Sequence, residues 1–126
     1  RLVSDALSFT REQPVAGVTE VVVRGDVDLA GGKPFERALA DAAATSAGVL
    51  VNLADCSFLD SSGLNALIRF AREGPAGRHV AVYCLPEGAV RQVFSLTRAH
   101  SLLDVHDDRG AALGALALAG GAPSDS

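Results

Sequence analysis

Residues 48–72 constrain the fold of this chain more than any other stretch. Residues 49–53 form a short run of branched apolar side chains bounded by turn residues, which predicts a buried strand. Further on, apolar residues recur with the spacing i, i+3, i+4 and i+7 of one helix face, at Leu64, Leu67, Ile68 and Ala71. A polar segment at residues 54–59 separates the two and is predicted to be a loop. The expected order is strand, loop, a corner at Asp60-Ser61-Ser62-Gly63, and helix.

The corner has two interpretations that are compatible with each other. Asp and Ser are favoured where a helix begins, because their side-chain oxygens accept hydrogen bonds from unpaired backbone N–H groups, so Asp60 and Ser61 are expected to cap the helix. A serine at this position can also accept phosphate, since a phosphoryl group there meets free N–H groups and the positive end of the helix dipole. Asp60 would repel that group. Physical reasoning alone favours the cap and does not separate Ser61 from Ser62, because both lie in the first turn.

The length and charge of the chain limit the kinds of protein it can be. Its 126 residues suit one domain, predicted at residues 1–119, followed by a flexible tail at residues 120–126 that is rich in Gly, Ala, Pro and Ser. The net charge of −4 without a basic block argues against nucleic acid as a partner. The sequence contains no run of about 18 apolar residues, so direct insertion into a membrane is not expected. No signal peptide is visible.

Alternating and continuous apolar runs predict the remaining strands. Strands are expected at residues 7–10, 18–24, 80–85 and 102–106, with turns at residues 14–17 and 73–77 and with Gly25 ending the second strand. The short separation of the first two predicts an antiparallel hairpin.

Helices are expected between these strands. Lys33-Pro34 opens the first, with its apolar stripe at Phe35, Ala38, Leu39, Ala42 and Ala43. A later helix carries Val90, Val93 and Phe94, and Asp107-Asp108 can cap a last one through Leu113, Leu116 and Ala117. Three successive strand–helix–strand units predict an α/β fold: a mixed, mostly parallel β-sheet of about five strands with about four flanking helices. Sites in such folds lie past the carboxyl ends of the strands, where residues 26–32, 55–62 and 86–87 are expected to meet.

Three segments resemble a known family. Residues 52–64, with the sequence NLADCSFLDSSGL, resemble the central signature of the STAS domain and are most similar to the bacterial anti-sigma factor antagonists. Residues 23–29 are similar to the family's turn before the first crossover helix, and residues 89–97 more loosely to its helix after the fourth strand. The resemblance covers roughly residues 5–117 and implies the STAS fold. Residues 30–32 are smaller than is usual in the family, which leaves the shape of that loop open.

The resemblance implies a cytoplasmic regulatory protein of the kind that acts in stress response or sporulation. In its unphosphorylated form it would bind an anti-sigma factor with serine kinase activity and so free the sigma factor. Phosphorylation at Ser61, with Ser62 as second choice, would release the partner, and a serine phosphatase would reset the cycle. The implied partner-binding surface consists of Asp26, Asp28, Asp60, Ser61, Ser62, Gly63, Asn65 and Arg69. The alternative is a constitutive STAS subunit of a lipid or anion transport complex or of a stress-signalling scaffold.

Nothing else in the sequence points to catalysis, a cofactor or a metal. Asp26 and Asp28 are read as turn acids that make local backbone bonds, because no ligand lies at metal spacing. The three histidines lie far apart, and Cys56 and Cys84 are expected to be buried or half-buried free thiols. No general base is placed for a hydrolase that would use Ser61. Arg69 and Arg72 lie either on a solvated helix face or at the edge of a surface for an acidic partner.

Overall fold

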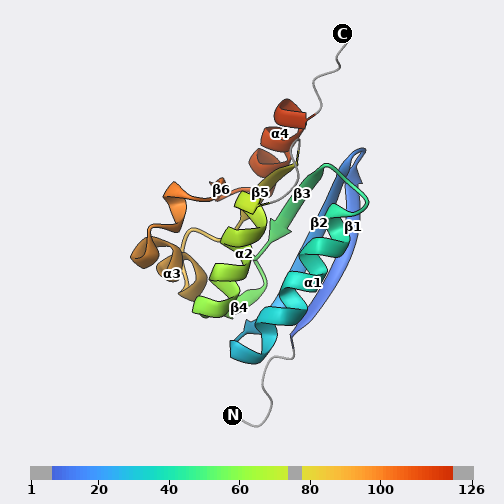
Figure 1. Cartoon of the computed structure of the whole chain (residues 1–126). Helices are drawn as coiled ribbons and strands as arrows, with labels where there is room; N and C mark the ends of the chain where they lie inside the picture. The colour runs from blue at the N-terminus through green and yellow to red at the C-terminus, as the bar shows by residue number, and fades with distance from the viewer. Residues whose placement is uncertain (1–6, 74–77, 121–126) are drawn as a thin grey trace.

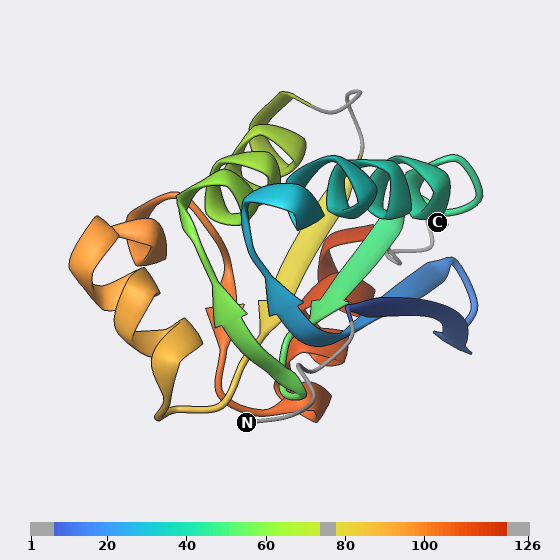
Figure 2. The same cartoon turned by 90° about the horizontal axis from the view of Figure 1, so that it is seen from below.

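The computed structural model describes residues 7–73 and 78–120. These residues form a six-stranded sheet with four α-helices, shown in Figures 1 and 2. The strands lie in the order β1-β2-β3-β5-β6, and β4 pairs with β2 outside this path. Every pair is parallel except the hairpin of β1 and β2. The predicted α/β class with a mixed, mostly parallel sheet is therefore confirmed, with one strand more than expected.

The N-terminal hairpin is longer than predicted. β1 (Ser8–Val15) includes Pro14, which an edge strand tolerates, so the turn is confined to Ala16 and Gly17. β2 (Val18–Val27) continues past Gly25, and the prediction that Gly25 ends the strand was wrong. The register shifts between Gly25 and Asp26, and Gly25 has a φ of 95°. This bulge lets the last residues of β2 pair with β4.

The segment after the buried strand is itself partly a strand, so the predicted loop at residues 54–59 was wrong. β3 (Gly48–Asn52) pairs with the first half of β2, and β4 (Cys56–Leu59) pairs with its second half. A turn at residues 53–55 joins them, held by the side chain of Asn52, which accepts the N–H of Ala54 at 2.9 Å. At about 3.3 Å per residue, β4 carries the chain about 13 Å onward before the helix begins.

Two helices lie side by side on one face of the sheet, as Figure 2 shows. A 3-10 helix, η1 (Leu29–Gly31), occupies the loop of small residues and leads into α1 (Gly32–Ala43), whose first turn contains Pro34 as predicted. The second helix is α2 (Ser61–Glu73). Because α1 and α2 each follow a strand that ends at the same edge, both helices begin at that end of the molecule.

The C-terminal half completes the sheet with shorter strands than expected. β5 (His79–Tyr83) leads to α3 (Ala89–Thr97), where Val90 and Phe94 are buried as predicted. Of the strand predicted at residues 102–106 only β6 (Val105–His106) forms. A second 3-10 helix, η2 (Ala99–Ser101), precedes it, and the N–H groups of Leu102 and Leu103 donate to the carbonyl of Ala99 and not to the sheet. The predicted turn at residues 73–77 and the predicted tail fall largely outside the described residues.

The last helix, α4 (Arg109–Gly120), covers the opposite face of the sheet. Asp108 caps it as expected, because its carboxylate accepts the N–H of Ala111 at 2.9 Å. The helix includes Leu113, Leu116 and Ala117 as predicted. Ala112 and Leu116 are buried against the sheet, whereas Ala117 is exposed.

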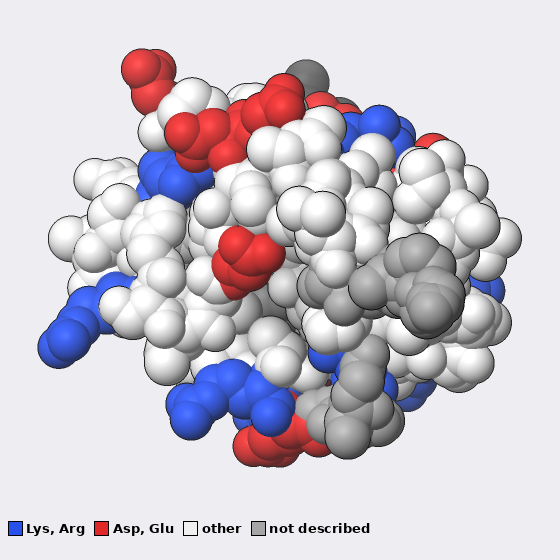
Figure 3. Space-filling model, turned by 90° about the horizontal axis from the view of Figure 1, so that it is seen from above, with Lys and Arg blue, Asp and Glu red and all other residues white. Residues whose placement is uncertain are grey.

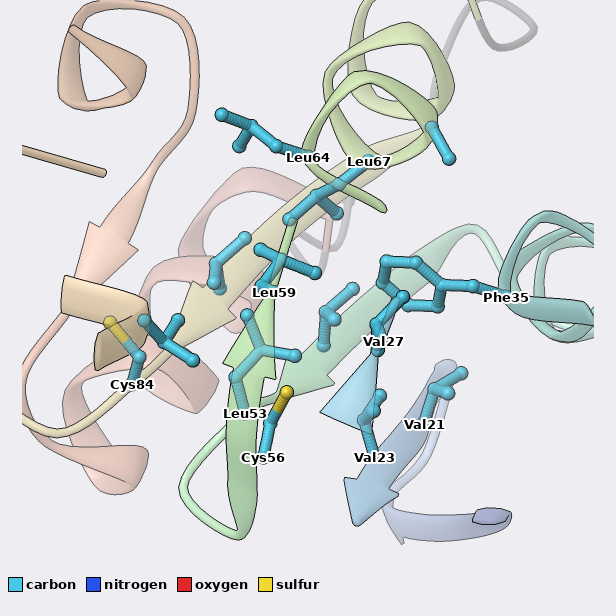
Figure 4. Close-up of a cluster of buried hydrophobic side chains, with 14 of the residues drawn as sticks. Val21, Val23, Val27, Phe35, Leu53, Cys56, Leu59, Leu64, Leu67 and Cys84 are labelled. Atoms are coloured by element: carbon cyan, nitrogen blue, oxygen red, sulfur yellow. The ribbon is translucent and has the colours of Figure 1, made fainter. Parts of the chain in front are cut away.

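The main core lies between the sheet and the pair α1 and α2. Figure 4 shows its side chains converging from the strands and both helices. Phe35 is fully buried and stacks on Phe9 of β1 with ring centroids 5.9 Å apart. This packing fixes α1 on the hairpin and thereby fixes the position of η1.

An ion pair between a buried glutamate and a partly exposed arginine fastens α4 to the sheet. Glu20 of β2 is 1% exposed, and both its carboxylate oxygens accept bonds from Arg109, at 3.0 and 2.6 Å. Asn52 donates a further bond of 2.8 Å to Glu20. These bonds, chiefly that from Arg109, hold the pKa of Glu20 below its ordinary value even though burial opposes them.

Charges are dispersed on the face that Figure 3 shows. Basic and acidic side chains both occur around its rim, and one acidic group lies near its otherwise uncharged middle. This face therefore offers no basic patch of the kind that binds a phosphate backbone. In the described part of the chain, no helix combines the length and the hydropathy that a membrane-spanning segment requires.

Candidate functional site

Asp60 organises the corner where α2 begins. Its Oδ1 accepts the backbone N–H groups of Ser62 and Gly63, at 2.9 and 3.2 Å, and the hydroxyl of Ser62 at 2.9 Å. Its own N–H donates to the carbonyl of Val27 at the end of β2. Asp60 is thus the N-cap of α2 and also joins β4 to β2.

Ser61 takes no part in this cap, so the expectation that it caps the helix was wrong. It occupies the first position of α2, is exposed, and makes no hydrogen bond through its hydroxyl to any described residue. Because Asp60 already serves the first turn, the cap does not need the exposed hydroxyl of Ser61.

Ser62 lies in a different environment, although it is the next residue. Its hydroxyl is committed to Asp60, and its side chain is half-buried against Gly32 at the start of α1. A Cβ on Gly32 would lie 3.4 Å from the Cβ of Ser62. The structure therefore distinguishes the two serines by exposure and hydrogen bonding, which the sequence did not.

Gly63 permits the close packing beneath this corner. An added Cβ would lie 2.6 Å from Leu59 Cδ1 and 2.7 Å from Val27 Cγ1, which is closer than real Cβ contacts. Only glycine fits here without movement of the two side chains. The predicted partner-binding residue Gly63 is thus buried and supports the corner from below.

The two acids of the β2 loop have different roles. Asp28 is exposed and caps η1, because its Oδ1 accepts the N–H of Gly31 at 3.2 Å. Asp26 is half-buried within β2, opposite Phe58 of β4. Both line a hollow of about 600 Å³ that opens toward β1 and also includes Phe9. The local backbone bond predicted for these acids is present for Asp28.

The outer face of α2 continues the site away from the corner. Asn65 is exposed, and Arg69 forms an ion pair with Glu36 of the neighbouring helix α1. Sequence reasoning missed Glu36, because 33 residues separate the partners and no local pattern joins them. Sequence reasoning also missed Gly32. The signal that could have found it is a glycine at the start of a helix that packs next to the serine corner.

The loop at residues 86–87, which was expected to meet residues 26–32 and 55–62 at one surface, does not lie at the corner of Asp60 and Ser61. Residues of the 86–87 loop, among them Glu87, line a separate hollow of about 390 Å³ together with Asp55 and Ser57. Asp55 also pairs with Arg24 at 3.7 Å. Because β4 separates Asp55 from Asp60, the expected single surface is divided into two.

Cys56 and Cys84 are buried free thiols, as expected. Burial raises the pKa of Cys56 to about 11 and raises that of Cys84 as well. Over residues 7–73 and 78–120, no three His, Cys, Asp or Glu side chains are grouped as a metal ion would require.

Comparison with known families gives a match over most of the chain. The model of the family described as "Mlab, STAS domain" matches residues 10–104 of the 126. The matched part includes the corner, both helices beside it and the whole of β2 to β5. A comparison with curated proteins found no match.

Solved structures share the fold. An anti-sigma factor antagonist from Mycobacterium paratuberculosis is 24% identical, with a TM-score of 0.79 over 88% of this chain and 94% of that one. The anti-sigma factor antagonist SpoIIAA in its unphosphorylated form is 17% identical, with a TM-score of 0.62 over 82% and 92%. The murine anion transporter Solute Carrier 26 family member A9 is 18% identical, with a TM-score of 0.62 over 84% of this chain but 18% of its own.

Proposed function

The chain belongs to the STAS domain family, and from this premise we propose that it is an anti-sigma factor antagonist switched by phosphorylation. Unphosphorylated, it binds an anti-sigma factor that is also a serine kinase, and the sigma factor is released. The kinase then phosphorylates Ser61, the complex separates, and a serine phosphatase restores the binding form. The chain itself has no catalytic role in this cycle, and the ATP that the kinase needs places the cycle in the cytoplasm.

The observation that carries the proposal is the free, exposed hydroxyl of Ser61 beside a cap that does not need it. A kinase must bring this hydroxyl to the γ-phosphate of ATP, and the hydroxyl of Ser62 would first have to leave Asp60. The site therefore favours Ser61 as the acceptor. SpoIIAA, which shares the fold at 18% identity and a TM-score of 0.61, is known in a phosphorylated form, and that agrees with the proposal.

The charge of the corner explains how one phosphate can release a partner. A phosphoryl group adds about two negative charges at the start of α2, where backbone N–H groups tolerate an anion. The fold can therefore persist while the surface changes. Asp28 and Asp60 already make this surface acidic, so a partner that fits it must then face a much higher negative charge. A penalty of a few kcal/mol at such an interface weakens binding by about 10²-fold or more.

The family description and the transporter support a second candidate. A STAS domain can serve as a constitutive subunit of a lipid or anion transport complex, or of a stress-signalling scaffold, and the transporter that shares this fold carries such a domain as part of its chain. In that case Ser61 would not be modified, and binding would not respond to ATP.

Co-purification distinguishes the two candidates. The tagged chain is expected to retain an ATP-binding serine kinase from lysate of its own organism, and MgATP is expected to elute that kinase. The Ser61→Ala variant should keep the kinase bound after MgATP, whereas Ser62→Ala should release it as wild type does. Retention of a transporter ATPase that MgATP does not elute would support the second candidate instead.

A further inference from the structure

The exposed side of α2 carries a continuous stripe that begins at the corner. Ser61, Asn65, Ile68 and Arg72 follow one another at i, i+4, i+7 and i+11, which places them on one line along the helix. At 1.5 Å per residue, the Cα atoms of Ser61 and Arg72 lie about 16 Å apart along the helix axis. A partner that docks on the corner thus meets this stripe next.

The far end of the stripe is hollowed. A depression of about 440 Å³ is lined by Asn65, Ile68, Arg69, Arg72 and Glu73. Ile68 is half-buried and packs against the core, so it gives the hollow an apolar part that is held in place. The depression therefore combines an apolar contact with two guanidinium groups and the carboxylate of Glu73.

The two arginines differ in how their charges are used. Arg69 is held by Glu36 of α1, and this ion pair neutralises its charge and fixes it as a wall of the hollow. Arg72 is exposed and forms no ion pair with any residue of the described part of the chain. A partner complementary to this surface would present a carboxylate to the unpaired guanidinium and an adjacent aliphatic side chain to the apolar depression.

We infer that this hollow docks an acidic segment of the anti-sigma partner, in which a carboxylate pairs with Arg72 and an aliphatic side chain contacts Ile68. The inference rests on the proposed function for the identity of the partner. It assigns separate roles to the two ends of α2: Ser61 carries the switch, and Arg72 sets affinity and its dependence on salt.

The distance between the two ends makes this division testable. The axial separation of about 16 Å between the two Cα atoms is about twice the Debye length of about 8 Å at physiological ionic strength, so salt screens the effect of a phosphate on Ser61 on a pair at Arg72. Loss of the Arg72 charge should then weaken the unphosphorylated and the phosphorylated complex by the same factor.

The experiment compares Arg72→Glu and Arg72→Gln with Arg37→Glu, a matched charge reversal at an exposed arginine of α1 that lacks an ion pair among the described residues. Calorimetry with the kinase retained in co-purification should show binding about fivefold to tenfold weaker for Arg72→Glu. Arg72→Gln should lose a smaller factor, and Arg37→Glu should bind as wild type. The difference between wild type and Arg72→Glu should shrink at high salt.

A second measurement needs no identified partner. A short synthetic peptide that alternates glutamate and leucine, titrated into labelled protein, should shift NMR signals of residues 65–73 in wild type but not in Arg72→Glu. The matching lysine–leucine peptide should cause no shifts there. Shifts elsewhere, shifts unchanged in the variant, or a change in the self-association of the chain in Arg72→Glu would overturn the inference. If Ser61 is phosphorylated and releases the kinase but Arg72→Glu binds the kinase as wild type does, only the docking inference is overturned. If the acidic peptide binds at residues 65–73 but the kinase does not phosphorylate Ser61, only the proposed switch is overturned.

Discussion

The hydroxyl of Ser62 donates to Asp60 Oδ1 at 2.9 Å, and the same oxygen accepts the backbone N–H of Ser62 at 2.9 Å. One carboxylate oxygen thereby holds both polar groups of Ser62 and leaves Ser61 outside the network. Two adjacent serines with similar sequence contexts thus have different chemistry. The cap belongs to Asp60, and the free hydroxyl belongs to Ser61.

Replacement of Asp60 by Ala should therefore destabilise the protein. The change removes the acceptor of two backbone N–H groups at the start of α2, and loss of such a cap costs about 1 kcal/mol and up to about 2. Urea unfolding followed by circular dichroism measures the change. Ser61→Ala is the control and should stay within about 0.5 kcal/mol of wild type, because its hydroxyl has no intramolecular partner. Equal losses for the two variants would contradict the assignment of the cap.

Gly63→Ala should also destabilise the protein, although alanine is the better helix former. Its Cβ would contact Leu59 at 2.6 Å and Val27 at 2.7 Å, and overpacking of this kind costs roughly 1–3 kcal/mol. Gly114→Ala in α4 is the matched control, since a Cβ there has nothing within 4 Å. That change should stabilise the protein by about 0.5–1 kcal/mol. Urea midpoints that move in the same direction for both variants would refute the steric account.

The pair of Glu20 and Arg109 predicts a specific dependence of stability on pH. The folded pKa of Glu20 is below its unfolded value near 4.5, chiefly because Arg109 hydrogen-bonds to the carboxylate. The stabilisation is therefore complete above pH 4.5 and is lost as the pH falls through the folded pKa. Thermal unfolding between pH 6 and pH 3 should show a steeper loss for wild type than for Glu20→Gln. Parallel curves for the two proteins would show that this pair does not contribute.

The buried thiols should be unreactive in the folded protein. Burial raises the pKa of Cys56 to about 11, so at pH 8 its thiolate is scarce and shielded from reagents. Ellman's reagent should label Cys56 and Cys84 only as fast as the protein opens, and unfolding in urea should accelerate labelling strongly. Rapid labelling of either thiol in the native protein would be inconsistent with the packing described.

The sequence predicted the fold where patterns are local and failed where contacts are distant. The apolar run of β3 and the helical spacing of α2 depend on neighbouring residues, and both were found. β4 was missed because Cys56 and Leu59, its buried residues, are three positions apart and do not alternate with polar ones. Its pairing also depends on the bulge at Gly25 in a remote strand.

The same limit applies to polar groups. Glu20 resembles a solvated strand residue in sequence, but it is buried, and the arginine that pairs with it, Arg109, lies 89 positions later. The serine corner was located by its resemblance and by helix-start chemistry. The difference between Ser61 and Ser62 needed the side-chain bond to Asp60 and the contact with Gly32, which no sequence pattern shows.

The intact mass of the protein after incubation with MgATP and the co-purified kinase tests the central claim most directly. We expect one added phosphate in wild type and in Ser62→Ala, none in Ser61→Ala, and loss of binding to the kinase in step with the added mass. A phosphate that persists in Ser61→Ala, or no added mass in wild type despite tight binding, would contradict the proposed switch.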